Sequence, residues 1–163
     1  MVTLIYDRTA ADVERWRVLR DKGWSGMSEK ERQEWLGEIV PTPAASKGMY
    51  THNDLNRVER AVGAILELIR SAGYKPPELN IKTDWTYQDA LWRGDIDRYY
   101  SNVETLRSFL AVFPSTPNVP SADTPLDYRL ANDIEKILAD VNSIFANMVQ
   151  SRYYTGEIYS GEV

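Results

Sequence analysis

An amide and a carboxylate lie three positions apart at two places in the chain, a spacing that puts both on one helix face. Asn56 precedes Glu59, and Asn132 precedes Glu135, each inside a run of helically spaced apolar residues. Carboxylates on facing helices can hold two metal ions, but such bundles usually add histidines at the same spacing, which these runs lack. We favour structural polar pairs or interhelical hydrogen bonds, with a metal site as the alternative.

His52 is the only histidine, and it falls in the first turn of a predicted helix. As a catalyst it would need a nucleophile or a metal partner, and the sequence supplies neither at a recognisable spacing. Motifs for phosphate binding, zinc proteases and serine hydrolases are also absent. The sequence therefore predicts a solvent-facing, dispensable His52 and a protein that is not an enzyme, with no catalytic residues, cofactor or metal.

Carboxylates and indole rings gather in the middle of the chain. Asp84, Trp85, Asp89 and Trp92 combine acids with flat aromatic rings, a combination that furnishes many sugar-binding sites. The same residues can form a capped helix start at Thr86, with Trp85 packed across it. We favour the structural interpretation, and we keep Trp85 and Trp92 as candidate interaction residues for a carbohydrate.

The stretch from Thr51 to Gly73 is the helix around which the rest of the chain is expected to pack. Its apolar residues recur at three- and four-residue steps, Thr51 and Asp54 form a capping box, and Gly73 followed by two prolines ends it. Further helices are expected from Thr9 to Gly23, from Ser28 to Gly37, from Asp95 to Phe113 and from Thr124 to about Gln150. A solvated helix face with local ion pairs is predicted for Asp7, Arg8, Arg15 and Arg20.

Two of the predicted helices carry similar sequences. The run Asn56–Val62 aligns with Asn132–Leu138, and the apolar register continues beyond both runs. Duplication and coincidence on a common helical pattern explain this likeness equally well. In either case the two helices are expected to pack together, with the contacts formed by Val58, Val62 and Ile65 on one side and Ile134, Leu138 and Val141 on the other.

The end of the chain repeats a pentapeptide, since Tyr154–Ile158 is followed directly by the similar Tyr159–Val163. Tyr, Thr, Ile and Val favour strands, so this tail is predicted to be a strand that pairs with Thr3–Tyr6. A second short strand is predicted at residues 79–82. A pair of strands leaves an edge open to a second copy or another protein. The candidate interaction residues of the tail are Tyr154, Glu157, Ile158, Tyr159, Glu162 and Val163.

Length and composition limit the class of protein. The 163 residues suffice for one domain with a core of its own, and the lack of cysteine excludes disulfides and thiol chemistry. A net charge of −5 without a basic run argues against nucleic acid as a partner. No stretch resembles a signal peptide or a membrane span, so we expect synthesis in the cytoplasm and no membrane contact.

These patterns predict a mainly α-helical fold, with three longer helices in a bundle, short N-terminal helices against it, and a small β element from the two termini. The expected single domain, residues 1–163, consists of a short-helix segment (1–40), the main bundle (49–150) and a strand-like tail (151–163).

Two stretches, Tyr50–Glu59 and Lys82–Thr86, resemble paired motifs in small structural proteins of phages and prophages of Gram-positive bacteria, tail-region proteins in particular. The segments Asp7–Val13 and Lys22–Trp24 and the closing Tyr-Ser-Gly-Glu-Val are similar to the same group. The resemblance implies a virion component made in the bacterial cytoplasm, associated with the tail or baseplate, that assembles with other virion proteins and with itself. The alternative is a module that binds a cell-surface glycan through Trp and Tyr faces.

Overall fold

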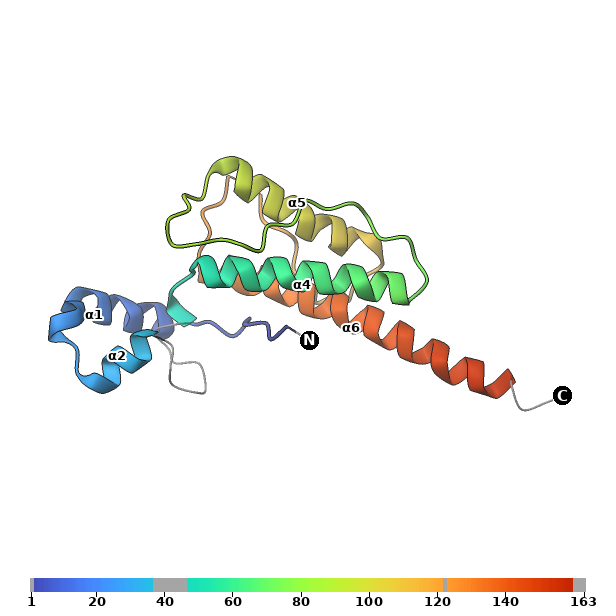
Figure 1. Ribbon diagram of the computed structural model, residues 1–163, viewed down its shortest axis with the longest axis horizontal. Coiled ribbons are helices and arrows are strands. Elements are labelled where there is room, and N and C mark those ends of the chain that lie inside the picture. The colour runs from blue at the N-terminus through green and yellow to red at the C-terminus, as the bar shows by residue number, and fades with distance from the viewer. Residues whose placement is uncertain (1, 37–46, 122, 160–163) are drawn as a thin grey trace.

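Helices are the only regular secondary structure in the residues that the computed structural model describes, which are 2–36, 47–121 and 123–159, with 152–159 as backbone alone. The helices are α1 (Ala10–Gly26), α2 (Glu29–Leu36), α4 (His52–Ser71), α5 (Arg93–Phe109) and α6 (Tyr128–Tyr159) (Figure 1). None of these described helices is long and apolar enough to cross a membrane. The predicted mainly helical fold is confirmed for this part of the chain.

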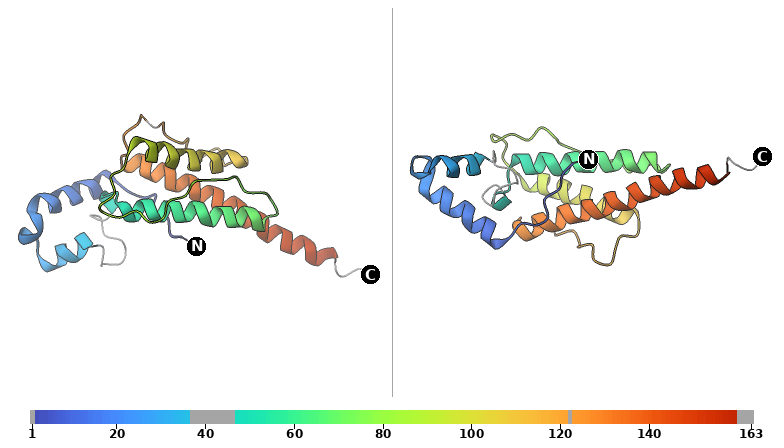
Figure 2. Two further views of the ribbon diagram at one scale, coloured as in Figure 1. Left: turned by 45° about the horizontal axis from the view of Figure 1, so that its top comes forward. Right: turned by 90° about the horizontal axis from the view of Figure 1, so that it is seen from below.

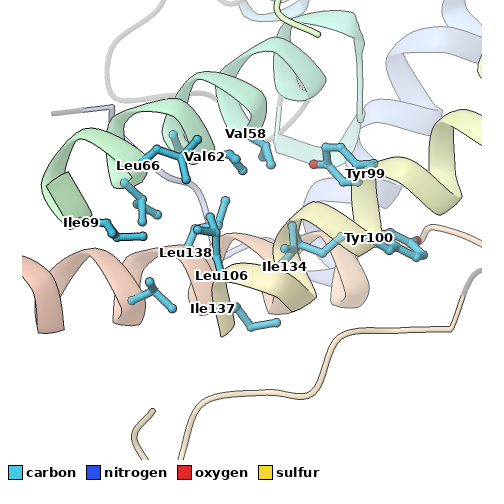
Figure 3. Packing of buried hydrophobic residues seen from close by; sticks show 14 of the residues in the cluster. Val58, Val62, Leu66, Ile69, Tyr99, Tyr100, Leu106, Ile134, Ile137 and Leu138 are labelled. Carbon is cyan, nitrogen blue, oxygen red and sulfur yellow. The ribbon is translucent and has the colours of Figure 1, made fainter. Parts of the chain in front are cut away.

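The three longer helices, α4, α5 and α6, pack against one another and enclose the main core. The most extensive contact joins α4 to α6, so the predicted pairing of these two similar helices is confirmed. Val58 and Val62 of α4 share the core with Ile134 and Leu138 of α6 (Figure 3), and all four are fully buried. Burial of each such side chain contributes about 1.5–3 kcal/mol, so this contact stabilises the fold.

Two parts of the molecule project from the bundle. At one end α1 and α2 form a helical hairpin (Figures 1 and 2) with a small core of its own, made of Leu19, Met27 and Trp35. The rings of Trp16 and Trp35 stack across this hairpin, with centroids 6.5 Å apart. At the other end α6 continues past α4 and α5 (Figure 2), so the protein is elongated.

The helix starts at Thr9 and Thr51 are confirmed. The backbone N–H of each threonine donates to the aspartate three residues later, Asp12 and Asp54, at 2.7 Å in both cases. The predicted end of the first helix at Gly23 is a kink instead. Gly23 adopts a φ of 66°, which favours glycine, and α1 then continues to Gly26.

The predicted start of the last helix at Thr124 is wrong. Thr124 lies in a turn, where its N–H donates to the carbonyl of Ser121. The cap is Asp127, whose Oδ1 accepts from the N–H groups of Arg129 and Leu130, both at 2.9 Å. An aspartate immediately before the helix satisfies two of its free N–H groups, which a threonine farther upstream does not reach.

The small β element predicted for the termini is also wrong. Residues 2–9 and 79–82 are extended, but no strand pairs with either among the described residues. Tyr154–Tyr159 continue α6 as helix, whereas 160–163 lie outside the described residues. Extending an existing helix adds a backbone hydrogen bond per residue without a new nucleus, and a short two-stranded ribbon is marginal in water. Gly156 weakens such a helix without ending it.

Candidate functional site

Two extended segments of the chain are held on the helices by asparagine side chains. On α6, Asn132 accepts a hydrogen bond from the backbone N–H of Arg8 (3.0 Å) and donates one to the Arg8 carbonyl (2.8 Å). On α4, Asn56 accepts from the N–H of Trp85 and donates to the Trp85 carbonyl, both at 2.8 Å. Each amide takes the place of a neighbouring strand, which explains why the segments are extended without strand partners.

Glu135 lies one turn after Asn132 and is fully buried. Its carboxylate accepts hydrogen bonds from the backbone N–H of Ile5 at 2.6 Å, from Arg8 at 2.8 Å, and from Arg57 of α4 at 2.6 Å. A buried carboxylate is tolerated where it is paired and hydrogen-bonded in this way. Glu135 therefore joins three parts of the chain: the N-terminal segment, α4 and α6.

Glu59 occupies the position on α4 that corresponds to Glu135 on α6, one turn after Asn56. Arg98 Nη1 of α5 lies 2.6 Å from Glu59 Oε1, which is ion-pair distance, but neither Glu59 oxygen makes a well-aligned hydrogen bond within the described residues. Burial raises the pKa of Glu59, and Arg98 and the nearby N–H of Lys82 offset part of that rise. Glu59 thus joins the segment at Lys82–Trp85, α4 and α5, with a looser pairing than Glu135 has.

The two sets of contacts form a repeated docking unit. The first unit consists of residues 5–12 and α4, and it docks on the Asn-x-x-Glu face of α6. The second unit consists of residues 82–89 and α5, and it docks on the same face of α4. The Asn/Glu pairs were expected to form structural polar pairs or interhelical hydrogen bonds: the glutamates do contact arginines of neighbouring helices, whereas the asparagines bind extended backbone. The similar helices α4 and α6 thus each receive a unit.

The sequence carries a mark of the docked segments that the helical pattern alone does not reveal. The pattern Asp-x-Thr-x-x-Asp occurs at residues 7–12 and again at 84–89. Thr86 N–H donates to Asp89 at 2.6 Å, as Thr9 N–H donates to Asp12 at 2.7 Å. The repeat is visible in the sequence as an internal likeness between two segments that lie far apart in the chain.

Arg8 is buried, with 4% of the residue exposed, so the predicted solvated position is wrong. Besides Glu135, its guanidinium contacts Asp54 at 3.1 Å and lies 5.4 Å from the centroid of the Tyr50 ring. These partners are distant in sequence, so the charges close to Arg8 in the sequence do not predict them. Arg8 is a central contact of the first unit.

The aromatic residues of the candidate sugar site differ sharply in exposure. Trp85 is only 4% exposed, and Lys82 Nζ lies 3.8 Å from its ring centroid, so this ring is not open to a ligand. Trp92 is 72% exposed and Tyr87 is 81% exposed. A shallow hollow of about 400 Å³ lies beside Tyr87, and its lining includes the half-buried His52. Of these three rings, those of Tyr87 and Trp92 are the exposed ones.

The candidate residues of the tail are only partly placed. Tyr154, Glu157, Ile158 and Tyr159 belong to the last turns of α6, and their side chains lie outside the described part of the chain. Glu162 and Val163 are outside the described residues altogether. The role of the tail in interaction therefore stays a prediction.

The polar side chains of the two docking units bind other parts of the chain. Glu59 and Glu135 each face an arginine, and Asn56 and Asn132 each bind a backbone amide group. Among the described residues, no group of three or more His, Asp or Glu side chains is placed to hold a metal ion. Comparison of the chain with protein families, with curated proteins and with solved structures finds no match.

Proposed function

We propose that the chain is a non-enzymatic structural protein of a phage or prophage virion, associated with the tail or baseplate and acting through protein–protein assembly. The resemblance of Tyr50–Glu59 and Lys82–Thr86 to tail-region proteins supports the virion setting. The polar residues support an architectural role, because Asn56, Asn132 and Glu135 make their hydrogen bonds to the chain's own segments. The protein is made in the bacterial cytoplasm and then joins other virion proteins and further copies of itself.

The projecting end of α6 is the observation that carries this proposal. The helix runs from Tyr128 to Tyr159, and its C-terminal part lies beyond the ends of α4 and α5 (Figure 2). The last described side chains there, at Gln150 and Ser151, are exposed. Helices in proteins derive most of their stability from packing an apolar face, so a projecting helical end is suited to a partner helix from another subunit.

Size-exclusion chromatography with light scattering tests the assembly role. We expect the full chain to form a defined oligomer, and a chain lacking residues 154–163 to shift towards the monomer with little loss of helical circular dichroism. The control replaces the exposed Lys30 of α2 with alanine and should leave the oligomer unchanged. A truncated chain that assembles as well as the parent would contradict a role for this end of α6.

Mass spectrometry of purified particles tests the virion setting separately. Particles induced from a host that carries the gene should contain the polypeptide in fixed proportion to other tail proteins. If the polypeptide is found only in the unassembled fraction of the lysate, the virion assignment is wrong.

A second candidate function is the binding of a cell-surface glycan, favoured by the exposed rings of Tyr87 and Trp92. Aromatic rings offer large, rigid apolar faces at an otherwise wet surface, which suits them to stacking on sugars. A glycan array probed with the parent and with Trp92→Ala distinguishes the two functions. A signal lost in the variant supports glycan binding, and no signal from the parent excludes it.

A further inference from the structure

The second docking unit buries several polar atoms that make no well-aligned hydrogen bond within the described part of the chain. They are both carboxylate oxygens of Glu59, Nη2 of Arg98 and Nε1 of Trp85. Glu59 is 1% exposed and Trp85 is 4% exposed, so bulk solvent does not reach these two side chains. Buried polar groups are costly without partners, so a cluster of such atoms indicates that a further group is bound among them.

These atoms belong to side chains that lie next to one another. Arg98 Nη1 is 2.6 Å from Glu59 Oε1, and the guanidinium carbon of Arg98 is 6.0 Å from the centroid of the Trp85 ring. Arg98 Nη1 also donates to the carbonyl of Asn80 at 2.7 Å, whereas Nη2 has no partner among the described residues. The donors of Arg98 and Trp85 and the oxygens of Glu59 therefore form one buried cluster.

The first docking unit shows which group completes such a cluster. The repeated pattern Asp-x-Thr-x-x-Asp places Arg8 and Trp85 at the same point, and an asparagine binds the backbone of each by the same two hydrogen bonds. In the first unit Glu135 accepts from Arg57 and also from Arg8, at 2.8 Å. An indole has one N–H and no charge, so Trp85 cannot supply what the Arg8 guanidinium supplies.

Lys82 does not replace that guanidinium. Its Nζ lies 3.8 Å from the centroid of the Trp85 ring and 3.5 Å from Asp89 Oδ1, so it pairs with a different carboxylate. A further cation in the cluster would face Arg98 and Lys82, and an anion would face Glu59. The position therefore suits a small neutral molecule that both donates and accepts hydrogen bonds.

We propose that a buried water molecule joins Trp85, Arg98 and Glu59 in the second docking unit. The water accepts from Trp85 Nε1–H and from Arg98 Nη2–H, and it donates to the carboxylate of Glu59. Buried waters typically make about three hydrogen bonds to groups that otherwise lack partners. This water does for Glu59 what Arg8 does for Glu135. The inference goes beyond the virion assignment, because it rests on the two docking units alone.

A crystal structure of the full chain, at a resolution that shows ordered water, tests the proposal directly. We expect a water oxygen within about 3.2 Å of both Trp85 Nε1 and a carboxylate oxygen of Glu59. If Trp85 Nε1 instead donates to a group of the chain, the proposal is overturned. It is equally overturned if no ordered water lies between the indole and the carboxylate.

NMR spectroscopy tests the same water in solution, through the indole N–H protons. The Trp85 proton should show a cross-peak to water with opposite signs in NOE and ROE spectra, which marks a long-lived water. Trp92 is 72% exposed and serves as the internal control, because hydration water exchanges too fast to give this signature. Trp85→Phe keeps an aromatic ring and identifies the resonance by its loss. Matching behaviour of the Trp85 and Trp92 protons would contradict a bound water.

Trp85→Arg gives the second unit the side chain that the first unit has at this point. The new guanidinium should displace the water and bind Glu59, as a crystal structure of the variant would show. The control Trp92→Arg changes an exposed ring and should keep the water in place. Water retained beside Glu59 in Trp85→Arg would refute the equivalence with Arg8. If Trp85→Arg does not fold, the two measurements on the parent decide the proposal.

Discussion

Asn56 and Asn132 hold two different segments of the chain by the same pair of hydrogen bonds, one accepted from a backbone N–H and one donated to the carbonyl of the same residue. The held residue is Trp85 in one case and Arg8 in the other. In both cases a glutamate one turn later faces an arginine from the next helix of the unit. This recurrence of geometry favours duplication over coincidence as the origin of the similar helices.

Asn132→Ala should destabilise the protein by about 1–3 kcal/mol, because it leaves the N–H and carbonyl of Arg8 without partners away from water. Asn56→Ala should have a similar effect through Trp85. The control Asn53→Ala changes an exposed residue of α4 and should stay within about 0.5 kcal/mol of the parent. Urea unfolding measures all three. If Asn132→Ala is as stable as the control, the docked segment contributes nothing to the fold.

Much of the fold follows from local rules. The capping boxes at Thr9 and Thr51 and the apolar stripe of α4 depend on residues three or four positions apart, so the sequence predicts them well. The contact between α4 and α6 is also predictable from the sequence, since each of these similar helices has an apolar face that must be buried against another element.

What the local rules miss is the binding of backbone by distant side chains. Residues 3–6 have the composition of a strand and are extended, but the N–H of Ile5 donates to Glu135. The nearby backbone of Arg8 binds Asn132, and both partners are more than a hundred residues away. Burial of Arg8 depends on the same long-range contacts, and its neighbours in sequence suggest only a solvated charge. The composition of the two termini predicts a strand pair because a strand normally pairs with another strand.

Val62→Asp places a carboxylate in the contact between α4 and α6, where Val62 is 1% exposed. An unpaired buried charge is expensive, so the free energy of unfolding should fall by several kcal/mol. Ala64→Asp, two positions on and exposed, is the matched control and should change stability little. Thermal melts of both variants suffice, and a Val62→Asp variant that melts like the parent would refute the packing of this contact.

Glu135→Ala should cost about 3–5 kcal/mol, since it removes the buried carboxylate that Arg8 and Arg57 share. The contrasting variant is Asp123→Ala, which breaks the ion pair with Arg93, where both side chains are more than 70% exposed. Such a surface pair contributes at most about 1 kcal/mol. Similar losses for the two variants in urea unfolding would contradict the structural role assigned to Glu135.

Glu59 should make the stability of the protein depend on pH. Its pKa is raised in the folded state above the ordinary value of 4.5, mainly by burial. The folded protein therefore holds this proton more tightly than the unfolded chain, so stability is highest below the unfolded pKa and falls as pH rises through the folded pKa.

Glu59→Gln removes this titration. Compared with the parent, the variant should gain stability as the pH rises from about 4.5 towards neutrality. Urea unfolding of both proteins across that range measures the difference. Parallel pH profiles would show that Glu59 has the same pKa in the folded and unfolded chain.

Replacing Trp85 or Trp92, which lie close together in the sequence, with alanine should have very different effects on stability. Trp85→Ala removes a ring that is buried beneath Lys82, and the cavity should cost about 3–5 kcal/mol. Trp92→Ala removes a ring that is mostly exposed, so stability should change by less than about 0.5 kcal/mol. Because Trp92 contributes so little to the fold, any loss of partner or glycan binding in that variant would be due to the missing surface ring and not to unfolding. If Trp92→Ala unfolds as easily as Trp85→Ala, then Trp92 is part of the core and is unavailable to a ligand.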